Sequence, residues 1–201
     1  SLRRQRQMCI RDRTPKDFSR AYFKYIAKVI SCINEDDVAS FIDHMIQARD
    51  RGSTIYFIGN GGSAATATHF ANDIGIGPRS WQKPFKALSL TDNQAVITAI
   101  GNDYGYDEVF SRQVEGLCRE GDVLIAISTS GNSGNVLKAI DTAHRAGASV
   151  IGLSGKSGGA LDAKCDVSLV VPSDITARIQ EMHIVIGHLI CALVEEHLGL
   201  D

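Results

Sequence analysis

The sequence lacks a long apolar run and the other marks of a membrane or secreted protein. No stretch of its 201 residues approaches the roughly 18 consecutive apolar residues of a membrane-spanning helix. The first residues lack the apolar segment of a secretory signal, so we expect neither export nor membrane insertion. The chain is long enough to bury a core in one domain, and its 44% hydrophobic and 22% charged residues are ordinary for a globular protein.

Cysteine is present without any pairing pattern. Five cysteines are scattered along the chain and form no CxxC pair: Cys9, Cys32, Cys118, Cys165 and Cys191. An odd, unclustered set is typical of reduced thiols in a cytosolic protein rather than of a disulfide scaffold. We therefore expect a cytoplasmic location, and no cysteine stands in a context that suggests a nucleophile.

The first thirteen residues differ in character from the rest. Residues 1–13 hold five arginines, show no apolar periodicity and include an internal Met8. We interpret them as a non-native adapter or cloning scar, or as a disordered segment. A basic arm that binds nucleic acid or membrane is the alternative. The rest of the chain, 14–201, is then a single domain. Without them, 16 Lys and Arg remain against 22 Asp and Glu, a net charge of −6. A domain this acidic is a poor general binder of nucleic acid.

Two amphipathic helices are expected before the first strand. Thr14–Asp17 reads as a helix start, with a capping threonine, proline at the first helical position and an acid in the first turn. Apolar residues then recur every four positions from Phe18 to Ile30. A second helix is expected after Asn34, ending at Gly52. We expect the two to form a helical hairpin that packs on a partner subunit.

Short apolar runs and helical segments alternate through the rest of the chain. The runs are continuous, as in strands that are buried on both faces of a parallel sheet: Thr54–Ile58, Lys86–Leu90, Val123–Ile127, Ser149–Leu153 and Val167–Val171. Helical patterns lie between and after them: Ala64–Asp73, Asn93–Leu117, Ser133–Ala146, Gly158–Ala163 and Asp174 to about Leu198. This order predicts an α/β fold, a doubly wound, flavodoxin-like three-layer α-β-α sandwich with a five-stranded parallel sheet.

Two of the expected strand ends carry sequences suited to a phosphate. Gly59–Ser63 offers three glycines before a helix N-terminus, where the backbone N–H groups and the helix dipole favour an anion. Ser128–Ser133 gathers four hydroxyls and an amide at a second helix N-terminus. Neither is a GxGxxG nor a GK[ST] motif, so dinucleotide and nucleotide-triphosphate fingerprints are absent. A tight turn and a cluster of helix caps are the alternative readings.

These segments resemble the sugar isomerase (SIS) domain family. The resemblance rests on GNGGS after the first strand, EGDVLIAISTSGNS around the third, and RIQEMH in the last helix. Within that family the chain is most similar to the phosphoheptose isomerases, from the N-terminal helices to about Leu198. This implies interconversion of D-sedoheptulose 7-phosphate and D-glycero-D-manno-heptose 7-phosphate in bacterial heptose biosynthesis, for lipopolysaccharide or capsule, by a homotetramer with active sites at subunit interfaces.

Candidate groups for the reaction lie on two helices. An aldose–ketose isomerisation needs a base beside the acidic carbon and an acid or metal that polarises the carbonyl. His69 and Asp73 are four residues apart and share one helix face. The resemblance makes Asp73 the base and His188 the acid, and assigns one Zn²⁺ per subunit to His69, Asp73, Gln180 and His188. It assigns substrate binding to Asn60, Gly61, Gly62, Ser63, Asn102, Asp103, Ser128, Thr129, Ser130, Ser133 and Gln180.

Two features of this sequence complicate the assignment of the family's catalytic and metal-binding roles to these residues. The family usually has glutamate where Asp73 stands and an arginine near Gly77; Arg79 or Lys83 is a candidate replacement for that cation. Gln180 and His188 are eight residues apart, about 12 Å along a straight helix. One ion meets both only if the helix is distorted, the glutamine reaches far, or the ligands come from different subunits.

Two further functions share the same loops. A non-catalytic SIS protein, such as the branch that associates with the bacterial replication initiator, resembles this chain most over Val171–His183. The joint presence of His69, Asp73 and His188 favours catalysis over that reading. A sugar-phosphate-sensing regulator is the third reading, although no DNA-binding segment accompanies the domain.

Overall fold

The computed structural model describes residues 14–76 and 83–199. The chain divides into two compact units, one up to Cys32 and one from Ile33 onward. The first unit contains helix α2 (Pro15–Ile30), in which the Thr14 side chain accepts the N–H of Asp17 and proline occupies the first turn, as expected. Residues 1–13 lie outside the described residues, so their interpretation as a scar stays a prediction.

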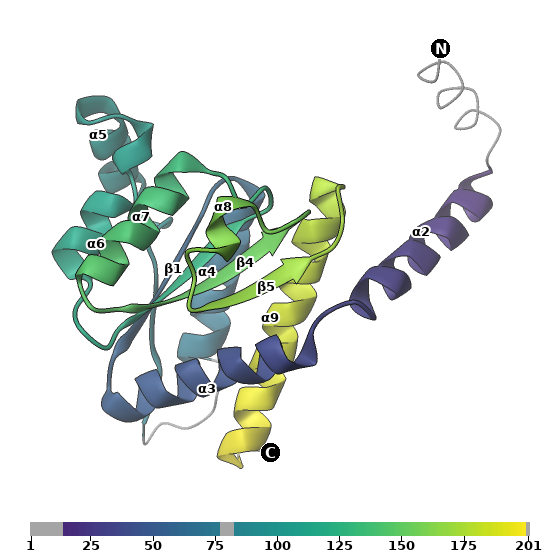
Figure 1. Cartoon of the computed structure of the whole chain (residues 1–201), viewed down its shortest axis with the longest axis horizontal. Coiled ribbons are helices and arrows are strands. Elements are labelled where there is room, and N and C mark those ends of the chain that lie inside the picture. Colours follow the sequence, from purple (N-terminus) through teal and green to yellow (C-terminus); the bar gives the residue numbers. More distant parts are fainter. Residues whose placement is uncertain (1–13, 77–82, 200–201) are drawn as a thin grey trace. The chain divides into compact units, whose positions relative to one another are not determined.

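The second unit is a three-layer α/β domain (Figure 1). Its strands are β1 (Thr54–Gly59), β2 (Lys86–Ser89), β3 (Val123–Ser128), β4 (Ser149–Gly155) and β5 (Val167–Val171). All neighbouring strands pair in parallel, in the order β2-β1-β3-β4-β5. This is the flavodoxin-like order, and it confirms the predicted sheet.

Helices cover both faces of this sheet. They are α3 (Glu35–Arg51), α4 (Gly62–Ile76), α5 (Gln94–Asp103), the 3-10 helix η1 (Tyr106–Glu108), α6 (Ser111–Leu117), α7 (Gly134–Arg145), α8 (Gly159–Asp162) and α9 (Thr176–Leu198). Helices α3, α4 and α9 lie on one side and α6, α7 and α8 on the other (Figure 1). Along β1, Ile55 and Phe57 alternate with Tyr56 and Ile58, and all four are buried because both faces are covered.

One expectation about the helices is corrected. The predicted helix Asn93–Leu117 is three pieces, because Gly105 takes a φ of +93° between α5 and η1. Phe41 and Met45 of α3 are fully buried within the chain, and packing of an N-terminal hairpin on a partner subunit stays a prediction. Capping of α3 by Asn34 and Gly52 is confirmed.

Helix α9 is the last element and, at 23 residues, the longest helix of the described part of the chain. Within the described residues it is the one helix long and apolar enough to cross a membrane by length and composition. Core helices of globular domains meet the same criterion, and α9 packs on α3, α4, β4 and β5. Packing within the domain therefore accounts for the buried part of α9, whereas Val185 and Leu189 stay exposed.

Candidate functional site

The two glycine- and serine-rich loops meet at the carboxyl end of the sheet. Strands β1 and β3 are neighbours, with Gly59 opposite Ile127, so the loops that follow them leave the same edge. They lie where the strand order reverses, the position at which open α/β sheets bind ligands. Gly59–Ser63 and Ser128–Ser133 therefore lie next to each other.

The loop after β1 closes into the first turn of α4. The N–H of Ser63 donates to the Asn60 carbonyl at 2.9 Å, and that of Ala64 to the Gly61 carbonyl at 3.0 Å. Gly61 has a φ of +54°, a left-handed conformation that favours glycine. A Cβ on Gly62 would lie 2.3 Å from Nε2 of Gln180, so the end of the Gln180 side chain occupies the space beside this glycine.

The loop after β3 is held by its own polar groups. Oγ of Ser128 and Oγ of Ser133 lie 3.0 Å apart, and Ser130 Oγ accepts the N–H of Asn132 at 3.1 Å. The Asn132 side chain also accepts the N–H of Ala160 at 3.0 Å, which ties the loop to α8. The hydroxyls are thus positioned by the fold at the N-terminus of α7, where N–H groups and the helix dipole favour an anion.

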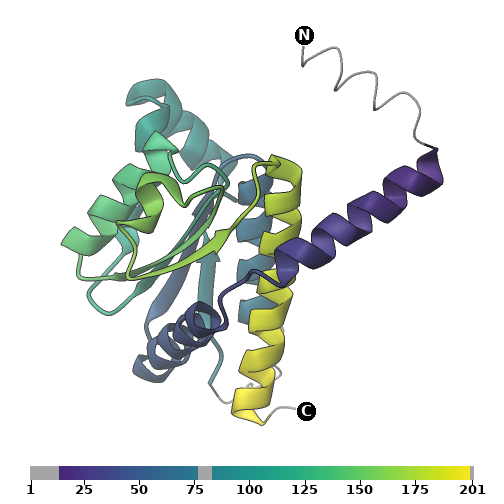
Figure 2. The ribbon, with the colours of Figure 1, turned by 45° about the vertical axis from the view of Figure 1, so that its right-hand side comes forward.

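Helices α4 and α9 run side by side in the same direction (Figure 2). Gln180 meets Gly62 near the start of both helices, and Gly187 meets Phe70 two turns further on. A Cβ on Gly187 would lie 1.4 Å from the Phe70 ring, so the absence of a side chain there brings the two helices close. This approach carries His188 onto the face of α4 that bears His69 and Asp73.

His69, Asp73 and His188 form one cluster. Oδ2 of Asp73 lies 3.0 Å from Nε2 of His69 and 3.7 Å from Nε2 of His188. The two imidazole rings stand edge to face, with centroids 5.1 Å apart. The other carboxylate oxygen, Oδ1, accepts from the Asn72 amide at 3.1 Å. The side chain of Asp73 is 24% exposed and those of His69 and His188 are 43% and 58% exposed, so the cluster is open to a ligand.

Two imidazoles and a carboxylate are a donor set that fits Zn²⁺. The three ligand atoms lie within 4.8 Å of one another, close enough to hold one ion. Gln180 lies against Gly62, about 12 Å along α9 from His188 at 1.5 Å per residue. Because α9 is an uninterrupted α-helix, distortion does not bring Gln180 and His188 together.

The remaining predicted residues are two substrate-binding residues and the candidates for the missing cation. Asn102 and Asp103 lie at the end of α5, where the Asn102 amide donates to Asp103 at 2.8 Å. Gly77 and Arg79 lie outside the described residues. The candidate cation Lys83 donates to the Asp50 carbonyl and carboxylate instead of facing the cluster. A hollow of about 430 Å³ between β2, α5 and α6 contains none of the predicted site residues.

His183 differs from its neighbours on α9. It is fully buried, its Nε2 lies 3.0 Å from the Ser154 carbonyl, and burial lowers its pKa to about 4. The neutral imidazole therefore donates from Nε2 and fastens α9 to the end of β4. His183 therefore has a structural role, whereas the His188 side chain is 58% exposed and faces Asp73.

Sequence reasoning missed Asn135 and Tyr106. Asn135 is 2% exposed in the first turn of α7, and it exchanges two 2.8 Å hydrogen bonds with the Asn60 side chain. The Tyr106 hydroxyl lies 2.9 Å from Oδ1 of the same Asn60. An asparagine inside a helical pattern is a weak signal of a side chain with another task, and nothing in the sequence marks Tyr106.

Comparison with known proteins agrees with this site. A model of the SIS domain matches residues 21–155. The chain is 54% identical over 145 residues to the phosphoheptose isomerase of Campylobacter concisus, covering 72% of this chain and 77% of that one. It is 46% identical to that of Aliarcobacter butzleri, covering 89% and 94%. The solved phosphoheptose isomerase of Neisseria gonorrhoeae superimposes with a TM-score of 0.83 at 39% identity, covering 91% of this chain and all of that one.

Proposed function

Because this chain belongs to the phosphoheptose isomerases of the SIS-domain family, we propose that Asp73 and His188 carry out the proton transfers of its reaction. The reaction interconverts D-sedoheptulose 7-phosphate and D-glycero-D-manno-heptose 7-phosphate through an enediol. The observation that carries the assignment is the single carboxylate oxygen of Asp73 facing two imidazoles.

Asp73 is suited to the role of base. A carboxylate takes the proton from the carbon beside the carbonyl and returns it to the neighbouring carbon. Nε2 of His188 lies 3.7 Å from Oδ2 of Asp73, so the two groups are close enough to act on adjacent atoms of one substrate. His188 would then move a proton between the two oxygens of the enediol.

The two loops are proposed to hold the phosphate away from this centre. The loop after β1 leads directly into α4, and His69 lies seven residues after Gly62, about 10 Å along the helix. A phosphate on the hydroxyls of Ser128–Ser133 and the N–H groups of the adjoining helix starts would leave the other end of the sugar near Asp73. We assign substrate contacts to the loop residues predicted from the sequence.

One Zn²⁺ per subunit is proposed at His69, Asp73 and His188. When bound, the ion would polarise the substrate carbonyl and stabilise negative charge on its oxygen. Gln180 would join these ligands by a long reach or from another subunit, since its own helix is continuous. Loss of zinc on His69→Ala, measured by atomic absorption, would support this site; full zinc retention would contradict it.

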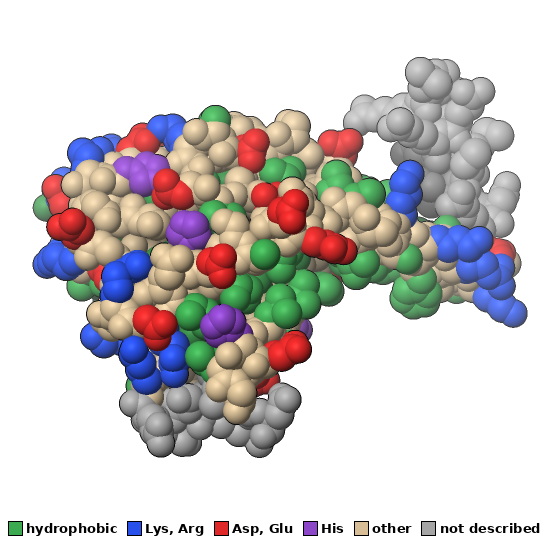
Figure 3. Space-filling model, turned by 60° about the horizontal axis from the view of Figure 1, so that its bottom comes forward, with side chains coloured by type: hydrophobic (Ala, Val, Ile, Leu, Met, Phe, Trp, Pro, Cys, Tyr) green, Lys and Arg blue, Asp and Glu red, His purple; other side chains and the backbone are tan. Residues whose placement is uncertain are grey.

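A cytoplasmic homotetramer is proposed. Hydrophobic side chains gather in the middle of the face that Figure 3 shows. Ile76, Val185 and Leu189 of the second unit are 71%, 42% and 43% exposed, and Val185 and Leu189 lie one turn apart on α9, so these side chains are available to a subunit interface. Light scattering at micromolar concentration tests the assembly, and a monomer would contradict it.

The roles of Asp73 and His188 are tested by three variants. Asp73→Asn keeps the shape but removes the basic lone pair, and we expect kcat to fall by about 10² or more with sugar-phosphate binding largely intact. His188→Gln should lower kcat and zinc affinity. Asp73→Glu restores the residue that is usual in the family. Turnover near wild type would show that the pocket accepts either carboxylate; a strong loss would show that it is built around aspartate.

Hydrogen exchange gives the decisive measurement. The wild-type enzyme, loaded with zinc and shown to bind the sugar phosphate, should exchange the C1 or C2 hydrogen of the substrate with solvent. Absence of exchange would refute the proposed chemistry. Exchange at the wild-type rate in Asp73→Asn would assign the base to another residue.

A further inference from the structure

A chain of hydrogen bonds starts at the backbone of α7 and ends at Tyr106. Oδ1 of Asn135 lies 2.9 Å from the N–H of Val136. A backbone N–H only donates, so this contact identifies which end of the Asn135 amide is the oxygen. The other end, Nδ2, therefore faces Asn60, and the orientation of this buried side chain is fixed.

The orientation of Asn135 determines that of Asn60. Nδ2 of Asn135 donates to Oδ1 of Asn60, and Nδ2 of Asn60 donates back to Oδ1 of Asn135, both at 2.8 Å. The Tyr106 hydroxyl meets Oδ1 of Asn60, an acceptor, at 2.9 Å. Tyr106 must therefore donate its single hydrogen to Asn60. Toward any ligand, its oxygen offers only lone pairs.

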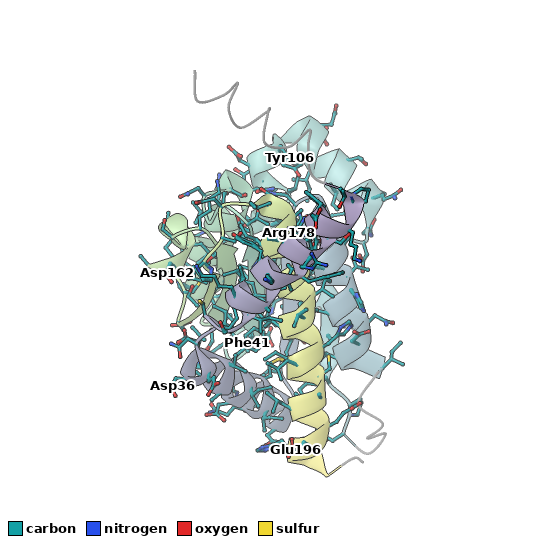
Figure 4. All side chains as sticks on the ribbon, turned by 90° about the vertical axis from the view of Figure 1, so that its right-hand side faces the viewer. Asp36, Phe41, Tyr106, Asp162, Arg178 and Glu196 are labelled. Carbon is teal, nitrogen blue, oxygen red and sulfur yellow. The ribbon has the colours of Figure 1, made fainter. Side chains whose placement is uncertain are left out.

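Tyr106 lies at the ligand-binding end of the domain. Figure 4 shows it at the same end as Arg178, near the start of α9, and opposite Glu196. Its segment is anchored on α7, because Glu108 pairs with Lys138. The Tyr106 residue itself is 59% exposed, although its hydroxyl is engaged. An exposed side chain bonded to a proposed substrate-binding residue is placed to meet the substrate.

We propose that Tyr106 binds a hydroxyl group of the sugar chain and contributes to substrate selection. The inference rests on the proposed function, since it uses the sugar phosphate as ligand. A sugar hydroxyl can donate to the Tyr106 oxygen, and the second hydrogen on Nδ2 of Asn60 can donate to an oxygen of the same sugar.

The phosphate is excluded from this position by its chemistry. A phosphate dianion carries no hydrogen to donate, and the Tyr106 oxygen has none left to give it. Tyr106 therefore distinguishes a hydroxyl-bearing carbon chain from the phosphate at its end.

Tyr106→Phe tests the proposal by removing one oxygen. We expect the dissociation constant for D-sedoheptulose 7-phosphate, and its KM, to rise about 2- to 10-fold, the scale of one net hydrogen bond. Binding of inorganic phosphate, measured by calorimetry or as competitive inhibition, should be unchanged. The matched control is Tyr104→Phe, an equally exposed tyrosine whose ring lies under Arg112, and it should leave both ligands unaffected.

Two results would overturn the proposal. Equal sugar-phosphate affinity in Tyr106→Phe and wild type would show that the hydroxyl does not meet the sugar. Equal weakening of inorganic phosphate and sugar phosphate would show that Tyr106 only holds the loop in place. The dissociation constants of the two ligands can be measured by calorimetry without turnover, so this test stands apart from the hydrogen-exchange test of the proposed chemistry.

Discussion

Gly187→Ala is the sharpest test of how α4 and α9 create the site. A Cβ at this position would lie 1.4 Å from Cε1 and 1.7 Å from Cζ of Phe70. The Phe70 ring is 3% exposed and stands edge to face with Phe57 at 6.2 Å, so it has little room to turn away. The added methyl group must therefore push the helices apart or force the ring from its position.

The cost can be worked from this geometry. Overpacking a filled core costs about 1–3 kcal/mol, and for a chain of this size each kcal/mol lowers Tm by about 2–4 °C. We expect a fall in Tm of about 2–12 °C. His188 follows Gly187 directly, and a displacement of about 1 Å can cost on the order of 10² in rate, so kcat should fall at least tenfold.

Calorimetry and a turnover assay measure the two effects. Gly116→Ala is the matched control, because a Cβ there has no atom within 4 Å and Gly116 lies inside α6; stability should rise by about 0.5–1 kcal/mol. The double variant Phe70→Leu with Gly187→Ala should be less destabilised than the sum of the single variants. A Gly187→Ala protein with wild-type Tm and kcat would refute the close helix contact.

Three other predictions concern separate parts of the molecule. Burial lowers the pKa of His183 to about 4 from 6.5, so the unfolded chain binds a proton in this window that the folded chain does not. This difference contributes on the order of 3 kcal/mol to the free energy of unfolding above pH 6.5, and the contribution is lost as the pH falls toward 4. Urea titrations at pH 5 and 7.5 should therefore show a larger change in unfolding free energy with pH for wild type than for His183→Gln. An equal change in the two proteins would contradict this prediction. Burial raises the pKa of the Cys165 thiol to about 12, so iodoacetamide at pH 7.5 should label the exposed Cys32 well before Cys165. Peptide mass spectrometry measures the two labelling rates, and equal rates in the folded protein would be evidence against this prediction. Replacing three of the four hydroxyl residues of the second loop, Ser128, Thr129 and Ser130, by alanine should raise KM more than it lowers kcat, because the phosphate is unchanged in the reaction. Wild-type kinetics in this triple variant would place the phosphate elsewhere.

The sheet could be predicted from the sequence because local pattern and burial agree. Runs such as Val123–Ile127 are continuous and apolar, and only strands covered on both faces need that pattern. The break in the helix over 93–117 could not be foreseen as easily. Its apolar spacing continues through Gly105, and only the positive φ of that glycine shows that the chain turns there.

Some residues of the site could likewise be predicted from the sequence, and others could not. His69 and Asp73 are linked by helical spacing, which the sequence displays. That His188 joins them depends on Gly187 fitting against Phe70, a contact between helices more than a hundred residues apart. Asn135 was missed for the same reason, since its partner Asn60 lies 75 residues away. Local chemistry is readable in one sequence, whereas register between distant elements is not.

The pairing of α4 and α9 also sets the distance between the loop after β1 and the His69–Asp73–His188 cluster, and helix geometry allows that distance to change only in whole turns. Gly62 and His69 are seven residues apart on α4, and Gln180 and His188 are eight residues apart on α9, so the two helices span similar lengths between the loop and the cluster. One inserted residue between Gly62 and His69 would rotate the histidine by about 100° and carry it out of the cluster. Acceptance of a longer or shorter sugar phosphate therefore cannot be tuned gradually by such insertions. It requires whole helical turns, about 5.4 Å each, gained or lost on both helices together.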